Sequence, residues 1–378
     1  MSDMSGKQAS QEPDPDDNQR AGQQGRDLAQ ISRRMALAGG SSAALAAMLA
    51  ACAGGGTKAT TSSKAPHKTM LQSDAIFANH TAYRFTVICH QRDAGLFIPL
   101  QYGLQDACAL LGCRYQWTGS RTSDATQMVQ ELNEAVAARV NGIATTLIEA
   151  KVFDAPVAAA RAAGIPVLAY NTDVAGSPAM AFIGSDPRQS GMLIAERIAK
   201  LLPQGGSLAL FAATPGTADI EPRIDVIKQQ LRQIPAITIT QVATGTTAAS
   251  QQAAVSAYLA ANPDLKGAFA VDGGSMEALA QVLDGKGSRL AAGGIDGGAE
   301  TFKLIASGGI DFTVEQQPYL QGFLAIMQLY LYNVSGGLVG IADSDTGLQL
   351  VTRAEVKPFL RTQSRFQGSS SQPGLQPA

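Results

Sequence analysis

The sequence predicts an α/β protein built from two lobes, each a doubly wound parallel sheet covered by helices. Short apolar runs typical of buried strands alternate with helix-like segments along most of the chain. This alternation restarts after Pro187 as if from the beginning. The apolar run 167–170 ends abruptly in Asn171-Thr172-Asp173, at the kind of strand end where open α/β sheets bind ligands. We therefore expect a binding site between the two lobes.

Four strand–helix repeats predict the first lobe. Strands are expected at residues 84–90, 114–118, 142–147 and 167–170, separated by helices at 96–111, 124–140 and 153–163. A second apolar run, 181–183, ends in Gly184-Ser185-Asp186-Pro187 and marks the crossing into the second lobe. Repeats of this kind imply parallel strands joined by right-handed crossovers.

The second lobe repeats the pattern. Helices are expected at 188–202, from about 221, and at 248–261, 276–283 and 299–307, with strands at 207–212, 237–242, 267–271, 290–294 and 312–315. The chain then returns through a helix at 319–335 and ends in a strand at 347–351. The expected domains are lobe 1 at 81–186 plus 317–345, lobe 2 at 187–316 plus 346–362, and a low-complexity, disordered tail at 363–378.

The first 52 residues have the features of an export signal rather than of a fold. A polar stretch precedes Arg33-Arg34, which resembles a Tat signal, and the apolar run that follows is too short to span a bilayer permanently. The run ends in a lipobox-like Leu-Ala-Ala-Cys, so we expect lipidation at Cys52. Residues 53–80 then form a flexible tether. An uncut membrane anchor and the general secretory route are the alternatives.

Composition argues against several classes of protein. The net charge of −2 gives no basic field for nucleic acid. The sequence has no Walker A motif, no G-x-G-x-x-G between a strand and a helix, and no nucleophile elbow, so an enzyme is disfavoured. His90 ends the first strand and could face the cleft. No CxxC or metal-ligand spacing occurs, and we expect neither metal nor cofactor.

Three cysteines remain after the signal: Cys89, Cys108 and Cys113. An odd number cannot all pair internally. One disulfide is an option, but buried free thiols are favoured.

The residues at the expected strand ends suit a polyhydroxylated ligand. Hydroxyl groups both donate and accept, so their site needs carboxylates, amides and arginine, with an aromatic face against the C–H side of a sugar ring. The candidate site residues are Phe97, Asn171, Glu221, Arg223, Asp272, Asp296 and Gln316. Each also has a plain structural alternative: Asp296 in an Asx turn, Asp272 as a helix cap, or Asn171 as a loop residue.

Four motifs within residues 83–351 resemble those of the ribose/galactose-type periplasmic sugar-binding family, the substrate receptors of ABC importers. They are LFIPLQYG at 96–103, GIPVLAYNTD at 164–173, GGIDGG at 293–298 and EQQPYLQG at 315–322. The resemblance implies two Rossmann-like lobes joined by three crossovers, which close over a monosaccharide. It also implies that Phe97 stacks on the ring, while Asn171, Asp272, Asp296 and Gln316 bind hydroxyls.

The sequence departs from this family at the site. Leu96 and Ile295 replace aromatic residues, and Thr172 stands where ribose-type members have arginine. Glu221 stands where a ligand-binding arginine is often found, with Arg223 two residues later. These differences argue against a ribose-specific pocket.

The resemblance also implies partners. We expect an extracytoplasmic lipoprotein that delivers a monosaccharide or similar polyol to an ABC permease, and through it to the ATPase. The alternative is a receptor for a nucleoside or autoinducer-like furanose that feeds a signalling partner. LacI-type repressors share the fold, but the export signal and the lack of a helix-turn-helix exclude that class.

Overall fold

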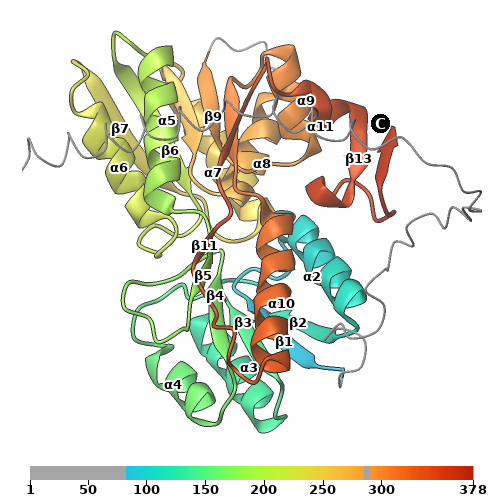
Figure 1. Cartoon of the computed structure of the whole chain (residues 1–378). Coiled ribbons are helices and arrows are strands. Elements are labelled where there is room, and N and C mark those ends of the chain that lie inside the picture. The colour runs from blue at the N-terminus through green and yellow to red at the C-terminus, as the bar shows by residue number, and fades with distance from the viewer. Residues whose placement is uncertain (1–81, 285–289, 378) are drawn as a thin grey trace, which may run out of the picture. The chain divides into compact units, whose positions relative to one another are not determined.

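Two six-stranded sheets form the centres of two lobes (Figure 1). The structure, a computed structural model, describes residues 82–284 and 290–377. The predicted export signal, Cys52 and the tether therefore lie outside the described residues. The two-lobe α/β fold predicted from the sequence is confirmed.

Lobe 1 has the strand order β11-β5-β4-β3-β1-β2, with every neighbouring pair parallel. Its strands are β1 (Arg84–Cys89), β2 (Arg114–Gly119), β3 (Gly142–Thr145), β4 (Val167–Tyr170), β5 (Phe182–Gly184) and β11 (Ser344–Asp345). Its helices are α2 (Phe97–Leu111), α3 (Ala125–Ala137), α4 (Asp154–Ala162) and α10 (Pro318–Val334).

Lobe 2 has the order β12-β10-β9-β8-β6-β7, parallel except for the β10–β12 pair. Its strands are β6 (Gly206–Ala212), β7 (Ile237–Ala243), β8 (Gly267–Ala270), β9 (Ala291–Ile295), β10 (Phe312–Glu315) and β12 (Gln349–Thr352). Its helices are α5 (Pro187–Leu201), α6 (Glu221–Leu231), α7 (Ala248–Ala261), α8 (Gly273–Leu283), α9 (Ala299–Ser307) and α11 (Lys357–Arg361).

Burial explains why the central strands are apolar throughout. Strands β3, β4 and β8 are buried at every residue, since helices cover both faces of each sheet. Each lobe accordingly has one apolar cluster on either side of its sheet. Cys89, Cys108 and Cys113 are buried and free, as favoured from the sequence. The Sγ atoms of Cys108 and Cys113 lie 3.2 Å apart.

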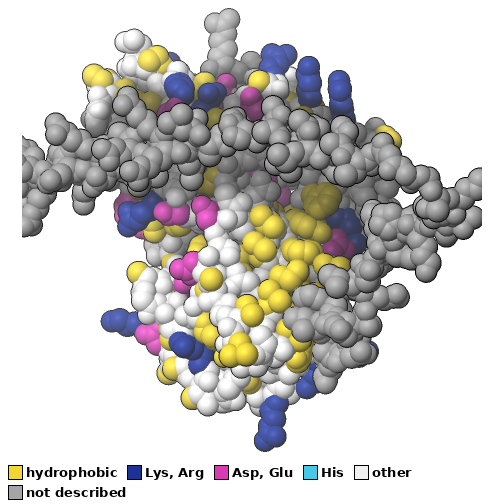
Figure 2. Space-filling view, viewed as in Figure 1, with side chains coloured by type: hydrophobic (Ala, Val, Ile, Leu, Met, Phe, Trp, Pro, Cys, Tyr) yellow, Lys and Arg dark blue, Asp and Glu magenta, His cyan; other side chains and the backbone are white. Residues whose placement is uncertain are grey.

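Helices α2 and α10 pack backbone to backbone on one face of the lobe 1 sheet. A Cβ atom on Gly103 would lie 2.1 Å from the Tyr319 carbonyl oxygen, and one on Gly322 would lie 2.2 Å from the Leu100 carbonyl oxygen. Only glycine permits this approach. Helix α10 has no charged residue, and Figure 2 shows hydrophobic side chains gathered along it. Among the described residues, no helix is both long and apolar enough to span a bilayer.

The chain crosses between the lobes three times, after β5, after β10 and between β11 and β12. Side chains join these crossings. Ser185 Oγ donates to Gln316 Oε1 at 3.1 Å, and Thr346 Oγ1 donates to the Gln316 carbonyl at 3.1 Å. Gln316 therefore links all three segments of the hinge.

The C-terminal tail differs from its expected disorder. Strand β13 (Thr362–Ser364) pairs antiparallel with β14 (Leu375–Pro377), and the short 3₁₀ helix η1 (Arg365–Gln367) lies between them. Two side chains of this low-complexity segment have partners in lobe 1: Arg365 pairs with Asp106, and the Phe366 ring contacts Tyr319. These contacts order a segment whose composition alone predicts no packing.

Candidate functional site

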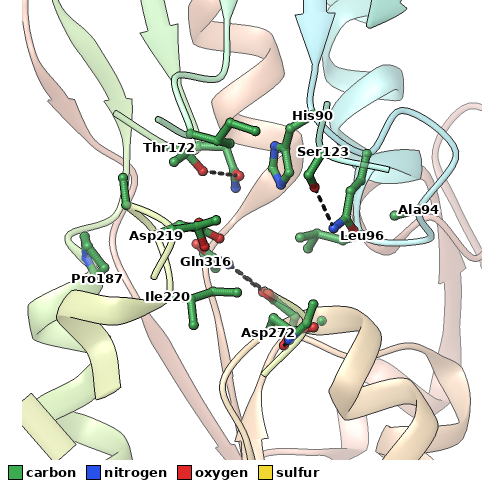
Figure 3. A pocket seen from close by; sticks show the side chains of 18 of the residues that line it. His90, Ala94, Leu96, Ser123, Thr172, Pro187, Asp219, Ile220, Asp272 and Gln316 are labelled. Atoms are coloured by element: carbon green, nitrogen blue, oxygen red, sulfur yellow. Dashed lines mark hydrogen bonds between the residues drawn. The ribbon is translucent and has the colours of Figure 1, made fainter. Parts of the chain in front are cut away.

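A cavity of about 950 Å³ lies between the lobes, at the ends of the parallel strands. This volume is at the upper end of the range for small-molecule sites. Figure 3 shows His90, Ser123 and Thr172 entering from one side, Asp272 and Ile220 from the other, and Gln316 between them. The cavity occupies the place that the sequence predicts for the site.

The two lobes touch at the rim of this cavity. The Ala218 backbone N–H donates to the Ile148 carbonyl at 3.4 Å. A Cβ atom on Gly95 would lie 2.8 Å from Glu277 Oε1, and one on Gly273 would lie 3.6 Å from Leu96 Cβ. These cross-cleft contacts show the lobes in a closed arrangement.

Asp296 follows β9 with a left-handed backbone, φ 61°, and its side chain is buried. Both carboxylate oxygens accept from Gln316 Nε2, at 3.0 and 2.8 Å. This interaction holds the carboxylate toward the hinge; among the described contacts it takes no part in an Asx turn. Burial raises the pKa of Asp296 to about 7, although Arg223 and Gln316 oppose the shift.

Gln316 positions Asp296 through its amide. Its Nε2 atom is committed to the Asp296 carboxylate, while its Oε1 atom accepts from Ser185. The amide therefore connects Ser185 in the hinge to Asp296 in the cavity wall.

Asp272 combines both roles considered from the sequence. It caps α8, with Oδ1 accepting from Ser275 N at 2.8 Å and Oδ2 accepting from Ser275 Oγ and Ala213 N at 2.7 Å each. Its side chain also lines the cavity. Burial raises its pKa, and the hydrogen bonds partly offset that effect. Because Oδ2 already accepts twice, Oδ1 is the freer acceptor.

Arg223 is buried on α6 and lines the cavity from lobe 2. Its Nε donates to Ser190 Oγ at 2.8 Å, and its Nη1 donates to the Val271 carbonyl. Burial lowers its pKa, while the carboxylates of Asp219, Asp296 and Asp272 raise it. These contacts use part of the guanidinium, which has five N–H donors.

Asn171 directly follows β4 in a left-handed conformation, φ 60°. Its Nδ2 donates to Gln321 Oε1 on α10 at 3.2 Å, and its Oδ1 accepts from Thr172 Oγ1 at 3.2 Å. The side chain is thus fixed at the lobe 1 wall by the helix that leaves the hinge.

Phe97 and His90 form the aromatic part of the lobe 1 wall. Their rings meet edge to face, with centroids 5.4 Å apart. His90 Nδ1 is buried without a hydrogen-bond partner among the described residues, and burial lowers the His90 pKa. A buried polar atom aimed at a cavity is available to a ligand.

The prediction for Glu221 differs from the structure. Glu221 does not line the cavity; its Oε2 accepts from Gly216 N at 2.9 Å in the loop before α6. Residues two apart on a helix face different directions, so α6 can present only one of Glu221 and Arg223 to the cavity. Asp219 and Glu277, which no motif in the sequence marks, line the cavity instead. His90 also lines it, in keeping with its place at the end of the first strand.

Negative charge dominates the lobe 2 wall. Asp219, Asp272, Glu277 and Asp296 line it around the single guanidinium of Arg223. Burial also raises the pKa of Glu277. Such a wall provides many acceptors for hydroxyl groups and repels anions. Among the described residues, no group of three or more His, Cys, Asp or Glu side chains is placed to hold a metal ion.

Known proteins match this chain in sequence. Residues 85–336 match the family model described as "Periplasmic binding protein domain". The xylose/arabinose-binding protein XylF of Sulfolobus acidocaldarius is 42% identical over 309 residues, which cover 77% of this chain and 76% of that protein.

Solved structures match the fold. An ABC transporter solute-binding protein from Burkholderia graminis, in complex with D-arabinose, has a TM-score of 0.69 and 27% identity, covering 74% of this chain and 98% of that one. The glucose-galactose binding protein GanP from Geobacillus stearothermophilus has a TM-score of 0.65 and 22% identity, covering 74% of this chain and all of that one, and supports the fold alone. The relatives are substrate-binding proteins and not enzymes, which confirms the interpretation against an enzyme. The chain belongs to the periplasmic binding protein domain family.

Proposed function

We propose that this protein is an extracytoplasmic, lipid-anchored sugar-binding protein that delivers a monosaccharide to an ABC importer. The observation that carries the proposal is the closed cavity between the lobes. It combines buried carboxylate acceptors, a partly unused guanidinium and an aromatic wall. This inventory suits a neutral polyol, whose hydroxyls donate and accept and whose C–H face packs on aromatic rings.

The relatives favour a pentose. The Sulfolobus protein is named for xylose and arabinose, and the Burkholderia structure contains D-arabinose. We propose the same substrate class for this chain. Phe97, Asn171, Arg223, Asp272 and Asp296 are proposed to contact the sugar, with Gln316 holding Asp296.

Membrane anchoring through Cys52 is also part of the proposal. It is supported by Arg33-Arg34, the apolar run and the lipobox in the sequence. Cys52→Ser should leave an unlipidated precursor that no longer partitions with membranes. Unchanged partitioning would contradict the lipoprotein assignment. Export that survives Arg33→Lys with Arg34→Lys would indicate the general secretory route.

A thermal-shift screen tests the binding function. Because a ligand that binds only the folded state raises the melting temperature, D-xylose and D-arabinose should stabilise the protein, and hexoses and nucleosides should do so less. Arg223→Leu should abolish the sugar-dependent shift, whereas Asp264→Asn, at an exposed position in lobe 2, should keep it. No shift with any sugar would contradict the proposal, and a shift with nucleosides alone would favour the alternative ligand class.

A further inference from the structure

We propose that residues 357–368, here called the C-terminal strap, latch the lobes in the closed arrangement and thereby slow release of the ligand. This inference rests on the proposed sugar-binding function. The strap runs from α11 in lobe 2 through β13 to η1 and Gly368 against lobe 1. Figure 1 shows this red segment beside the upper end of α2.

The lobe 2 end of the strap is anchored by an aromatic stack. Helix α11 packs on α9, and the rings of Phe359 and Phe302 stack with centroids 4.6 Å apart. Thr362 Oγ1 donates to the Pro358 carbonyl at 2.6 Å, which closes the end of α11. The strap therefore moves with lobe 2 up to residue 362.

The lobe 1 end is held by a socket on α2, formed by Tyr102, Gln105 and Asp106. Arg365 Nη1 lies 2.5 Å from Asp106 Oδ1, and its Nη2 donates to Gln105 Oε1. The guanidinium also lies over the Tyr102 ring, 4.8 Å from the centroid. The Arg365 side chain is only 12% exposed, so solvent screens this pair less than an ordinary surface ion pair.

Further contacts extend the socket onto α10 and the start of α2. Tyr319 donates its hydroxyl to Asp106 Oδ2 at 3.0 Å, and the Phe366 ring meets the Tyr319 ring 4.6 Å away. Gly368 has φ 70°, and a Cβ atom there would lie 2.9 Å from Pro99 Cδ. The strap backbone thus lies directly on the first turn of α2.

The position and length of the strap couple it to closure. Residues 98 and 99 follow Gly95 and Leu96, which meet α8 across the cavity rim. Only three residues separate α11 from Arg365, and they already form strand β13. Three extended residues span at most roughly 10 Å. Opening of this rim by more than a few ångströms would therefore pull Arg365 out of its socket.

Release kinetics test the latch, with D-arabinose as the probe. Arg365→Ala should speed sugar release about 5- to 20-fold, because a largely buried charge-assisted pair and a cation–π contact are lost. Arg365→Lys keeps the charge without the planar fork and should have an intermediate rate. Arg361→Ala is the matched control, since Arg361 is an exposed arginine of the same strap. Parent-like release from Arg365→Ala would overturn the proposal.

A disulfide that prevents the strap from leaving lobe 1 should have the opposite effect on sugar release. The Gly368 Cβ position lies 3.3 Å from Ile98 Cβ, close to the roughly 3.5–4.5 Å of disulfides. Gly368→Cys must shift the strap slightly, because its Cβ atom would lie 2.9 Å from Pro99 Cδ. The double variant Ile98→Cys with Gly368→Cys, loaded with sugar, oxidised and shown by thiol titration to hold the new disulfide, should release the sugar at least about tenfold more slowly than its reduced form, because the latch can no longer open. Equal rates in the two forms would overturn the proposal.

A third measurement separates failure of the latch from failure of sugar binding. Without sugar, small-angle scattering should give a larger radius of gyration for Arg365→Ala than for the parent or Arg361→Ala. A parent that binds none of the sugars would contradict the proposed function. In that case the scattering comparison still decides whether the strap holds the lobes closed.

Discussion

The two walls of the cavity differ in what they offer a ligand. Among its buried lining side chains, lobe 1 contributes neutral groups: the Phe97 ring, the His90 imidazole and the Asn171 amide. The charged residues of lobe 1 that line the cavity are exposed or half-buried: Asp93, Arg121, Asp173, Asp186, Asp343 and Asp345. Lobe 2 contributes charge, with Asp272 and Asp296 near Arg223. Charge-assisted hydrogen bonds are stronger than neutral ones. We therefore expect the buried charged groups of lobe 2 to supply more of the binding free energy than the neutral groups of lobe 1.

The largest effect is expected in lobe 2. Asp296→Ala removes both acceptor oxygens and leaves sugar hydroxyls unpaired in a closed cleft, which should cost about 2–4 kcal/mol of binding, or about 30- to 1000-fold in affinity. Isothermal titration with D-arabinose measures the loss, and a melting curve on the same variant checks its fold. Affinity within about threefold of the parent would remove Asp296 from the site.

The charged wall should also make binding depend on pH. The pKa of Asp296 is about 7 in the folded protein. The ionised carboxylate accepts charge-assisted hydrogen bonds at both oxygens, whereas protonation removes the charge and turns one oxygen into a donor. Sugar affinity should therefore rise about tenfold or more between pH 5.5 and pH 8, by proton linkage at this group. Asp296→Asn should flatten the profile. An equally steep profile in that variant would place the titration at another carboxyl of the cavity, Asp272 or Glu277, whose pKa values burial also raises.

The same carboxyl affects stability with the opposite sign. Because its folded pKa lies above the ordinary value of 3.8, the folded state binds the proton more tightly, and its contribution is lost as pH rises from about 4 to about 7. Without sugar, Asp296→Asn should remove that decline and melt higher than the parent at pH 8. A lower melting temperature at pH 8 would contradict this sign.

A smaller effect is expected in lobe 1. Phe97→Leu keeps an apolar side chain but loses the aromatic face, so affinity should fall about 2- to 13-fold, in line with about 0.5–1.5 kcal/mol for aromatic contacts. Titration at the same pH as the Asp296 series gives a direct comparison. If Phe97→Leu costs more than Asp296→Ala, lobe 1 and not lobe 2 dominates the affinity.

The smallest effect is expected at Glu221. Since its carboxylate binds the Gly216 backbone outside the cavity, Glu221→Ala should change affinity less than about twofold and lower stability by roughly 0.5–1 kcal/mol. Titration and a denaturant melt distinguish the two effects. A tenfold loss of affinity would return Glu221 to the site.

The fold could be predicted from the sequence because its signals are local. The run 167–170 is apolar throughout because both faces of the strand are covered. Gly-Ile-Pro and Gln-Gln-Pro mark the ends of helices and strands, because proline has a fixed φ and no N–H to donate. Six of the predicted site residues line the cavity because the ends of parallel strands, and the first turns of the helices that follow them, meet at one edge of each sheet.

The rest depends on tertiary contacts. Periodicity alone does not tell whether Glu221 or Arg223 faces the cleft, since that depends on how α6 packs. Asp219 and Glu277 line the cavity because of how the loop before α6 and helix α8 pack, which no motif in the sequence reports. The order of the tail follows from a socket on a helix some 260 positions earlier in the chain. Contacts between residues this far apart in the chain cannot be predicted from local amino-acid composition.

We propose above all that a cavity with an acidic lobe 2 wall binds a neutral sugar between closed lobes. Calorimetric titration of the parent with D-arabinose and with the corresponding acid, D-arabinonate, tests it most directly. We expect saturable binding of the neutral sugar and at least about 100-fold weaker binding of the anion, because an added carboxylate would face several others at low dielectric. Equal or tighter binding of the acid would contradict it.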